Sequence, residues 1–143
     1  MKRVRQRNYK LGDCGIACVA TIIGMEYKPV KRAFVELGIL REDGPFYTGH
    51  YDLIRVLKHF DFTTTMKEFV SWDDMEGNAI VKVNPYKPYY WHWVVYHRVD
   101  TKSGLILDPR PRYKEPLSSF KKHKGAGNYI LVEKNDNQFS DKQ

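Results

Sequence analysis

Cys14 is the residue best suited to covalent chemistry in this chain, because it opens a short apolar segment. Asp13 precedes it and Gly24 ends the segment, and the residues between them are mostly apolar. Since Asp is a favourable helix N-cap and Gly a favourable helix end, the sequence predicts a buried helix whose first turn is capped by the Asp13 carboxylate. A thiol in that turn lies at the positive end of the helix dipole, which favours the thiolate. The negative charge of Asp13 opposes this effect, so a strongly nucleophilic Cys14 needs a basic partner.

A histidine that is distant in sequence and held on a rigid element is the expected partner of such a thiol. The chain has five histidines: His50, His59, His92, His97 and His123. The first two lie in or beside a predicted helix and the last lies among lysines, so we expect these three at the surface. His92 and His97 both lie on the predicted strand Trp91–Val99, where a spacing of five residues puts them on opposite faces. Only one of the two can face the helix, so they cannot serve one site together.

Asp108 is the candidate for a third group that would orient the imidazole of His92. It ends a predicted strand that folds back toward His92 in a hairpin. An ideal hairpin centred on Lys102 would set Asp108 opposite Tyr96, about four residues short of His92, so a bulge or a register offset is required. Gly104 could supply a bulge. The alternative is that Asp108 only caps the turn that follows it.

The periodicity of the chain changes from helical to alternating. Apolar spacing and turn residues predict helices over 13–24, 28–38 and 48–60, with Thr48 as the cap of the third. Alternating and β-branched segments predict strands over 62–66, 79–83, 91–99, 105–107 and 128–133. Three helices followed by a mostly antiparallel sheet indicate an α+β fold. We divide the chain into a basic arm over 1–8, a single domain over 9–133 and a polar tail over 134–143 that we expect to be disordered.

Composition and charge restrict the function classes. The 143 residues suffice to bury the core of one domain. The net charge of +7 suggests acidic partners, but the basic residues are dispersed, so we expect no nucleic-acid partner. The longest apolar run, 16–25, is too short to span a bilayer, and no apolar signal-peptide core follows the basic N-terminus. We therefore expect a cytoplasmic protein without a membrane span, and assume a monomer.

The two cysteines indicate thiols rather than a disulfide. Cys14 and Cys18 lie four residues apart on one predicted helix, where they are poorly placed to bond to each other. Cys18 is expected to be a core residue. The spacings of cysteine and histidine fit no usual zinc pattern, and there is no phosphate-binding glycine loop, so we expect no metal and no cofactor.

Several short motifs resemble one family of enzymes. They are Asp13-Cys14-Gly15-Ile16-Ala17-Cys18, Thr48-Gly49, Ala79-Ile80-Val81-Lys82, His92-Trp93-Val94-Val95 and Leu107-Asp108-Pro109. In this order, from about Gln6 to Val132, the chain is similar to the bacteriocin-processing cysteine peptidases that cut double-glycine leaders, and to related papain-like cysteine peptidases. The resemblance implies a papain-like fold and a triad in which Cys14 is the nucleophile, His92 the general base and acid, and Asp108 the group that fixes the imidazole tautomer.

The resemblance is weaker upstream of Cys14. The glutamine that completes the oxyanion hole in the family usually stands six residues before the nucleophile, where this chain has Asn8, while Gln6 stands eight before it. Either a two-residue insertion follows and Gln6 donates to the oxyanion, or Asn8 does. We favour Gln6.

An aromatic run before and within the His92 strand has two interpretations. Tyr90, Trp91 and Trp93, together with Gly15 beside the nucleophile, are our candidates for substrate binding, and a narrow slot between them would suit the glycines of a peptide. The alternative is that the two tryptophans fill the core and the tyrosines cover a loop.

Three function hypotheses follow from these residues. The first is a stand-alone cysteine peptidase, acting on an amide or isopeptide bond of a peptide or protein substrate, such as one that contains glycine. The second is a catalytically silent, peptidase-like module that binds peptides or proteins. The third is a small basic binding factor, for which salt-sensitive binding would be the signature.

Overall fold

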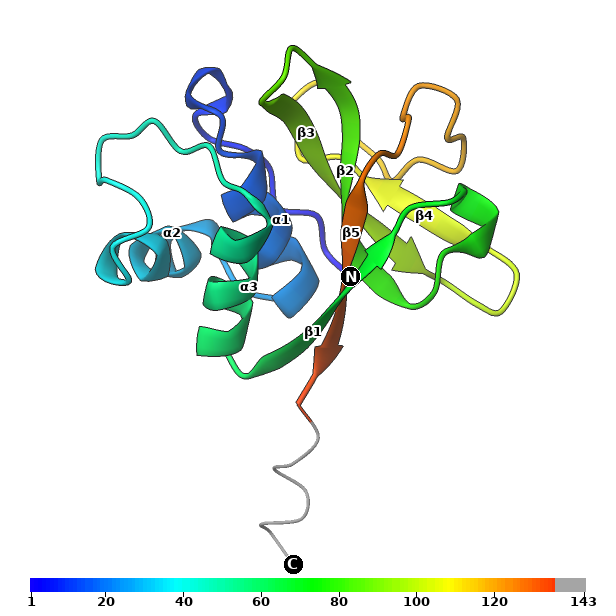
Figure 1. Cartoon of the computed structure of the whole chain (residues 1–143), viewed down its shortest axis with the longest axis horizontal. Coiled ribbons are helices and arrows are strands. Elements are labelled where there is room, and N and C mark those ends of the chain that lie inside the picture. The colour runs from blue at the N-terminus through cyan, green and yellow to red at the C-terminus, as the bar shows by residue number, and fades with distance from the viewer. Residues whose placement is uncertain (136–143) are drawn as a thin grey trace, which may run out of the picture.

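Three helices cover one face of a five-stranded antiparallel sheet in the computed structural model, which describes residues 1–135 (Figure 1). The elements are η1 (Tyr9–Leu11), α1 (Cys14–Ile23), α2 (Tyr27–Glu36), α3 (His50–His59), β1 (Phe62–Glu68), η2 (Trp72–Asp74), β2 (Asn78–Tyr86), β3 (Tyr90–Arg98), β4 (Gly104–Leu107) and β5 (Asn128–Lys134). The predicted α+β class, with N-terminal helices packed on an antiparallel sheet, is confirmed. The predicted tail lies almost wholly outside the described residues.

α1 is the central element of the helical layer. It packs against β2 and β3 on one side and against α2 and α3 on the other. Its residues from Cys14 to Thr21 are all buried, in agreement with a helix that is apolar around its whole circumference. α1 is therefore fixed from several directions, and so is the position of its first residue.

α2 and α3 are amphipathic, as predicted. The third helix does not begin as predicted, because its N-cap is Gly49, whose backbone N–H donates to the Asp52 carboxylate at 2.9 Å. The hydroxyl of Thr48 is buried without a hydrogen-bond partner. Thr48 contributes instead through its carbonyl oxygen, which accepts a hydrogen bond from the indole N–H of Trp93 at 3.1 Å.

The strands are arranged in the order β1-β5-β2-β3-β4, and every pairing is antiparallel. β2 does not stop at Asn84 as the sequence predicts. It continues to Tyr86 through a register shift after Val83, where Asn84 takes a positive φ of 50°. A polar side chain such as that of Asn tolerates this backbone conformation.

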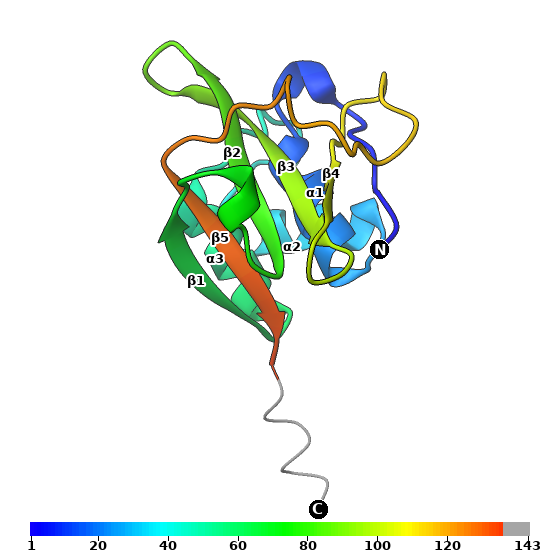
Figure 2. The ribbon, with the colours of Figure 1, turned by 90° about the vertical axis from the view of Figure 1, so that its right-hand side faces the viewer.

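A second cluster of apolar side chains lies on the sheet face away from the helices. Its buried members are Met75, Ala79, Val81, Val83, Val94, Tyr96, Ile106 and Tyr129. η2 and the segment 108–127 cross this face and cover the cluster (Figure 2). Both faces of the sheet are therefore packed.

The loops that carry the candidate site gather at one end of the molecule. η1, the β2–β3 hairpin and the segment after β4 lie together at the upper end in Figure 1, and β5 runs to the opposite end. Within residues 1–135, no helix combines the length and the apolar character needed to cross a membrane.

Candidate active site

Cys14 begins α1 and is buried, with 7% of its surface exposed. Burial raises the pKa of its thiol to about 11, and the charges of Asp13 and Asp108 act in the same direction. Hydrogen bonds from the backbone N–H groups of Trp93 and Gly15 oppose this shift. The expected thiolate-favouring effect of the helix terminus is thus outweighed by desolvation, so the resting residue is a neutral thiol.

The contact with Trp93 explains how α1 meets β3. β4 pairs with β3 only from Val95 to Arg98, so the part of β3 that carries His92 and Trp93 has no strand neighbour on this side. Cys14 lies at this open edge, near enough to the Trp93 backbone N–H for that group to lower the thiol pKa. His92 can consequently share a cavity with Cys14, although the alternation of β3 groups it with Val94, which packs on the face away from the helices.

His92 is bound to Asp108 through its ring. The distance between His92 Nε2 and Asp108 Oδ1 is 2.8 Å, and Asp108 is fully buried. Because a carboxylate only accepts, Nε2 carries the proton, and Nδ1 of the neutral ring keeps its lone pair. Burial lowers the pKa of His92, while the hydrogen bond to Asp108 opposes this. His92 is thus neutral at pH 7 with a basic nitrogen available.

The β3–β4 hairpin supplies the register that His92 and Asp108 need. Arg98 pairs with Gly104, a register that sets Asp108 opposite Val94 rather than Tyr96. This offset arises in the turn, because the pairing itself runs without a shift, so of the two predicted alternatives the register offset is found and Gly104 supplies no bulge. Gly104 has another role: a Cβ there would overlap the phenol of Tyr96.

Asp108 has more partners than the sequence predicts. Its Oδ1 accepts the backbone N–H of Arg110 at 2.9 Å in addition to the His92 ring, so capping of the turn and orientation of the imidazole occur together. Its Oδ2 accepts Nε2–H of His123 at 2.8 Å. Burial raises the pKa of the Asp108 carboxyl, but the hydrogen bonds from His123 and His92 outweigh this and hold the pKa well below its usual range.

His123 is the residue that sequence reasoning misplaced. It was expected at the surface among lysines, but it is 2% exposed, so this prediction is wrong. Asn84, near the end of β2, binds the backbone carbonyl of Lys122 and the backbone N–H of Lys124, and His123 between these two exposed lysines is turned inward. The signal was the alternation Lys-His-Lys, which a charge-based interpretation hides. Of the other two, His59 is exposed and His50 is half-buried.

The Asp13 carboxylate was predicted to cap α1, and this prediction is wrong. No N–H of the first turn reaches it, and only its backbone carbonyl accepts the Ala17 N–H. The carboxylate is buried and binds the N-terminal arm and α2 instead. Its donors are Gln6 Nε2 at 3.0 Å, the backbone N–H groups of Arg7 and Asn8, both at 2.9 Å, and the Tyr27 hydroxyl at 2.7 Å.

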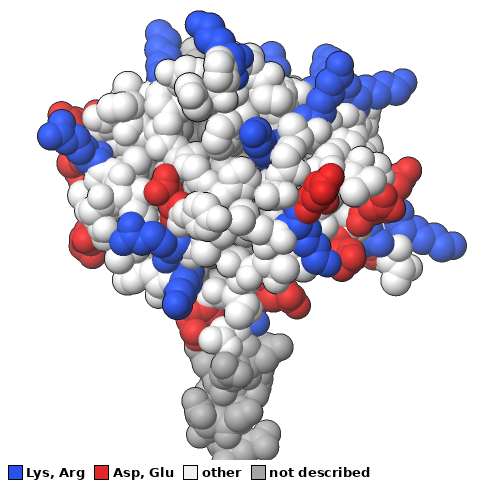
Figure 3. Space-filling model, in the orientation of Figure 1, with Lys and Arg blue, Asp and Glu red and all other residues white. Residues whose placement is uncertain are grey.

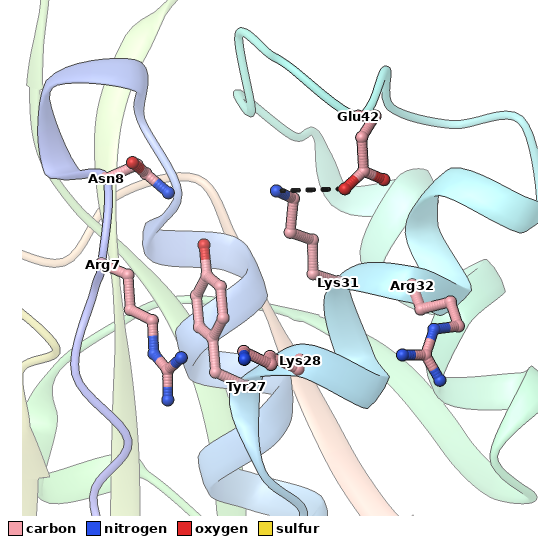
Figure 4. Close-up of a pocket in the computed structure, with 7 residues that line it drawn as sticks. All are labelled: Arg7, Asn8, Tyr27, Lys28, Lys31, Arg32 and Glu42. Atoms are coloured by element: carbon pink, nitrogen blue, oxygen red, sulfur yellow. Dashed lines mark ion pairs between the residues drawn. The ribbon is translucent and has the colours of Figure 1, made fainter.

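The structure separates the two candidates for the oxyanion donor. Gln6 lines a cavity of about 190 Å³ together with Cys14 and His92. Asn8 lines a different hollow, where it lies near Arg7 and Tyr27 (Figure 4). The backbone N–H of Gln6 also donates to the carbonyl of Pro109 at 2.8 Å, which ties the arm to the segment after Asp108.

A narrow aromatic slot also adjoins Cys14. Its volume is about 30 Å³, and its walls include Tyr90, Trp91 and Trp93, three of the predicted substrate-binding residues. Trp93 is also part of the core under the helices. It therefore both fills the core and lines the slot, as the two interpretations of the aromatic run separately predicted. Gly15 lines neither this slot nor the larger cavity, and a Cβ on it would overlap the Thr48 hydroxyl.

Comparison with solved structures defines the class of the fold. The peptidase domain of Streptococcus ComA, a bifunctional ABC transporter involved in quorum sensing, matches with a TM-score of 0.66 and 22% identity over 94% of this chain and 98% of that one. A double-glycine motif protease from an AMS/PCAT transporter, solved in complex with the leader peptide, matches with a TM-score of 0.62 and 19% identity over 94% and 91%. The peptidase domain of Streptococcus mutans ComA gives 0.59 and 22% over 93% and 99%.

The chain therefore has the fold of these peptidase domains, as its motifs predicted. No protein-family model matches the sequence, and no curated protein does. Among the residues that the structure describes, no group of three or more His, Cys, Asp or Glu side chains has the arrangement of a metal site.

Proposed function

We propose that this protein is a cysteine peptidase, or a related amide hydrolase, with Cys14 as nucleophile, His92 as base and Asp108 as the orienting carboxylate. The observation that carries the proposal is the tautomer of His92. Its Nε2–H is bound to Asp108 at 2.8 Å, which leaves the lone pair of Nδ1 for the thiol, and Cys14 and His92 line one cavity. This is the arrangement that nucleophile–base–orienter catalysis requires.

The reaction would run in two stages, formation of a thioester on Cys14 and its hydrolysis, each with two proton transfers. The Sγ–H proton of Cys14 passes to Nδ1 of His92 as sulfur attacks the carbonyl carbon. The C–N bond then breaks, and the Nδ1 proton passes to the leaving amine, which gives a thioester and a free amine. Water next attacks the thioester and gives its proton to Nδ1, and the C–S bond breaks with return of that proton to sulfur.

Gln6 is our candidate for the oxyanion donor, in preference to Asn8. One hydrogen of its Nε2 is held by Asp13, which fixes the amide orientation and leaves the second hydrogen for the oxyanion. A donor of this kind contributes about 3 kcal/mol to the stability of the transition state. Asn8 lines a separate hollow, which does not contain Cys14.

The substrate we propose is a peptide or protein with glycine at the cleavage site. The slot beside Cys14 is narrow, and Tyr90, Trp91 and Trp93 leave no room in it for a branched side chain. The fold is that of a protease named for a double-glycine motif and bound to a leader peptide. Glycine residues in the slot would let the scissile carbonyl approach Cys14 closely.

Alkylation of Cys14 as a function of pH tests the proposed base. Folded protein would be treated briefly with substoichiometric iodoacetamide and analysed by mass spectrometry, with the buried Cys18 as an internal control. We expect Cys14 to react at neutral pH, far below its raised thiol pKa of about 11, because His92 takes the proton. In His92→Ala the profile should move up toward that alkaline pKa.

The matched control is His97→Ala, which removes a histidine from the same strand that is bound to Asn78 and lies outside the cavity. Its alkylation profile should equal that of the wild type. Equal profiles for the wild type and His92→Ala would exclude His92 as the base.

One observation favours a second candidate, a peptide-binding module without catalysis. Burial keeps the Cys14 thiol protonated, as a silent site would. If Cys14→Ala leaves the biological effect of the protein unchanged, while mutations in the aromatic slot remove it, the binding function is the correct one.

A further inference from the structure

A second hollow adjoins the cavity that contains Cys14. The cavity that contains Cys14 and His92 also contains Tyr9 and Arg110. These last two residues, with Pro111 and Arg112, line an adjoining hollow of about 390 Å³. We call this hollow the arginine hollow. The two spaces share these two lining residues, so they adjoin each other, and we refer to them together as the cleft.

The proposed chemistry determines which part of a substrate the arginine hollow would receive. His92 gives its proton to the leaving amine, so the segment after the scissile bond leaves on the His92 side of Cys14. Arg110 lines the cavity together with His92, whereas the aromatic slot contains neither of them. The acyl part of the substrate thus belongs in the aromatic slot, and the leaving segment belongs in the arginine hollow.

The arginine hollow is cationic and held in shape. Within residues 1–135, no carboxylate lies at ion-pair distance from Arg110 or Arg112. The backbone around them is fixed, because Arg110 N–H is bound to Asp108 and its carbonyl accepts the Tyr113 N–H at 3.2 Å. Arg112 lies over the Tyr113 ring at 4.9 Å. Arg112 also donates a hydrogen bond to the Tyr113 hydroxyl at 3.2 Å. Guanidinium groups that have no ion-pair partner and stand on a fixed loop are suited to bind carboxylates.

The surroundings have the same sign of charge. In Figure 3, Lys and Arg side chains stand along the upper edge of the molecule, where Figure 1 places η1, the β2–β3 hairpin and the segment after β4. That segment has six basic residues against one exposed acid, Glu115: Arg110, Arg112, Lys114, Lys121, Lys122 and Lys124. The field at the mouth of the cleft would attract anionic chains.

We propose that the arginine hollow binds carboxylates of the leaving segment, so that the enzyme prefers acidic residues directly after the scissile bond. The assignment of the leaving segment to this hollow rests on the proposed peptidase function, but the anion site itself can be tested without catalysis. The guanidinium groups of Arg110 and Arg112 can each form two hydrogen bonds with a carboxylate at a partly exposed site. We expect them to give a preference of about fivefold for acidic over neutral side chains.

The binding test uses Cys14→Ala protein, isothermal calorimetry at low salt and two synthetic hexapeptides, one of alternating Asp and Glu and one of alternating Asn and Gln. We expect the acidic peptide to bind about fivefold tighter, and the difference to disappear in Arg110→Glu/Arg112→Glu. If the reversed-charge variant is poorly folded, Arg110→Gln/Arg112→Gln removes the charges with less disturbance.

The control with the same change of net charge is Lys28→Glu/Arg32→Glu, because these residues line the separate hollow of Figure 4. It should keep the preference for the acidic peptide. Equal binding of both peptides, or an equal loss in the control, would overturn the proposal and mean that only the general positive charge of the protein is felt.

A turnover test separates the two proposals. Internally quenched peptides that are identical through Gly-Gly would continue with Asp-Glu or with Asn-Gln, and the ratio of kcat/KM should favour the acidic one about fivefold. Cleavage of both at equal rates would refute the arginine hollow and leave the peptidase function intact. Acidic binding in calorimetry without cleavage of either peptide would refute the peptidase function and keep the anion site.

Discussion

Each carboxylate oxygen of Asp108 accepts a hydrogen bond from an imidazole N–H group. The donors are His92 and His123, each at 2.8 Å. A carboxylate bound on both sides has little freedom to rotate, so the ring of His92 is held in one orientation. His123 is itself fixed by the Trp72 indole N–H, which donates to its carbonyl at 2.8 Å. The orientation of the proposed base thus depends on a residue that is far from the substrate.

His123 should act as a positioning residue. We expect His123→Ala to slow the alkylation of Cys14 at pH 7 about tenfold, because Asp108 loses one of its two ring donors and holds His92 less firmly. His123→Gln keeps an N–H donor and should recover part of the rate. Urea unfolding measured on both variants reports their stability. A rate equal to that of the wild type in a destabilised His123→Ala would mean that His123 only supports the fold.

Only some of the residues of the candidate site could be predicted from the sequence. Cys14, His92 and Asp108 could be predicted because short motifs and the resemblance identify them. His123 could not, because its burial depends on a pairing between its neighbours and Asn84, which is distant in sequence. Asp13 looked like a helix cap for a similar reason, since the arm that binds its carboxylate folds back on α1 from outside the helix.

Among the elements, α1 requires a residue without a side chain at its second position, Gly15. Gly15 lies against Thr48 so closely that a Cβ would overlap the threonine hydroxyl, and that hydroxyl has no hydrogen-bond partner to lose. The approach of α1 to the start of α3 therefore depends on the missing side chain.

We expect Gly15→Ala to lower the free energy of unfolding by about 1–3 kcal/mol, as overpacking does. Thr48→Ala alone should be nearly neutral, and the double variant should recover part of the loss, because removal of the hydroxyl leaves only the Leu53 side chain, 3.1 Å from the new Cβ, to shift. Urea unfolding of the four proteins measures this as a double-mutant cycle. Additive effects would show that Thr48 is not the obstacle.

Element types followed from the sequence, whereas pairing did not. The three helices and five strands are predictable because apolar periodicity reports burial of one face or of the whole element. The register of the hairpin between β3 and β4 could not be predicted beyond the need for an offset, since it is set in the turn rather than by either strand. The same limit applies to Thr48 and Gly49, where tertiary contacts decide which residue begins α3.

For the whole molecule, the buried site links stability to pH. The pKa of His92 is lowered by burial, so between its ordinary value of 6.5 and its lowered value the unfolded chain binds a proton that the folded protein does not. Stability therefore falls as pH falls below about 6.5. The pKa of Asp108 is lowered below 3.8, which gives a second loss of stability as pH falls below that value.

We expect the free energy of unfolding to decrease from pH 7.5 to pH 5, and His92→Gln to reduce this slope. The pKa of His97 is lowered as well, by burial, but this residue is half-buried, so His97→Gln should reduce the slope less. Urea unfolding at each pH provides the values. A slope that is unchanged in His92→Gln would show that His92 is not the group that titrates.

The paths of the two chain ends decide how this protein can be attached to a surface. Arg3 and Gln6 bind the backbone of Asp108 and Pro109, so the N-terminal arm runs beside the cleft. β5 ends at Lys134, at the end of the molecule opposite to η1 (Figure 1). A bead or electrode coupled beyond β5 therefore leaves the cleft facing the solution.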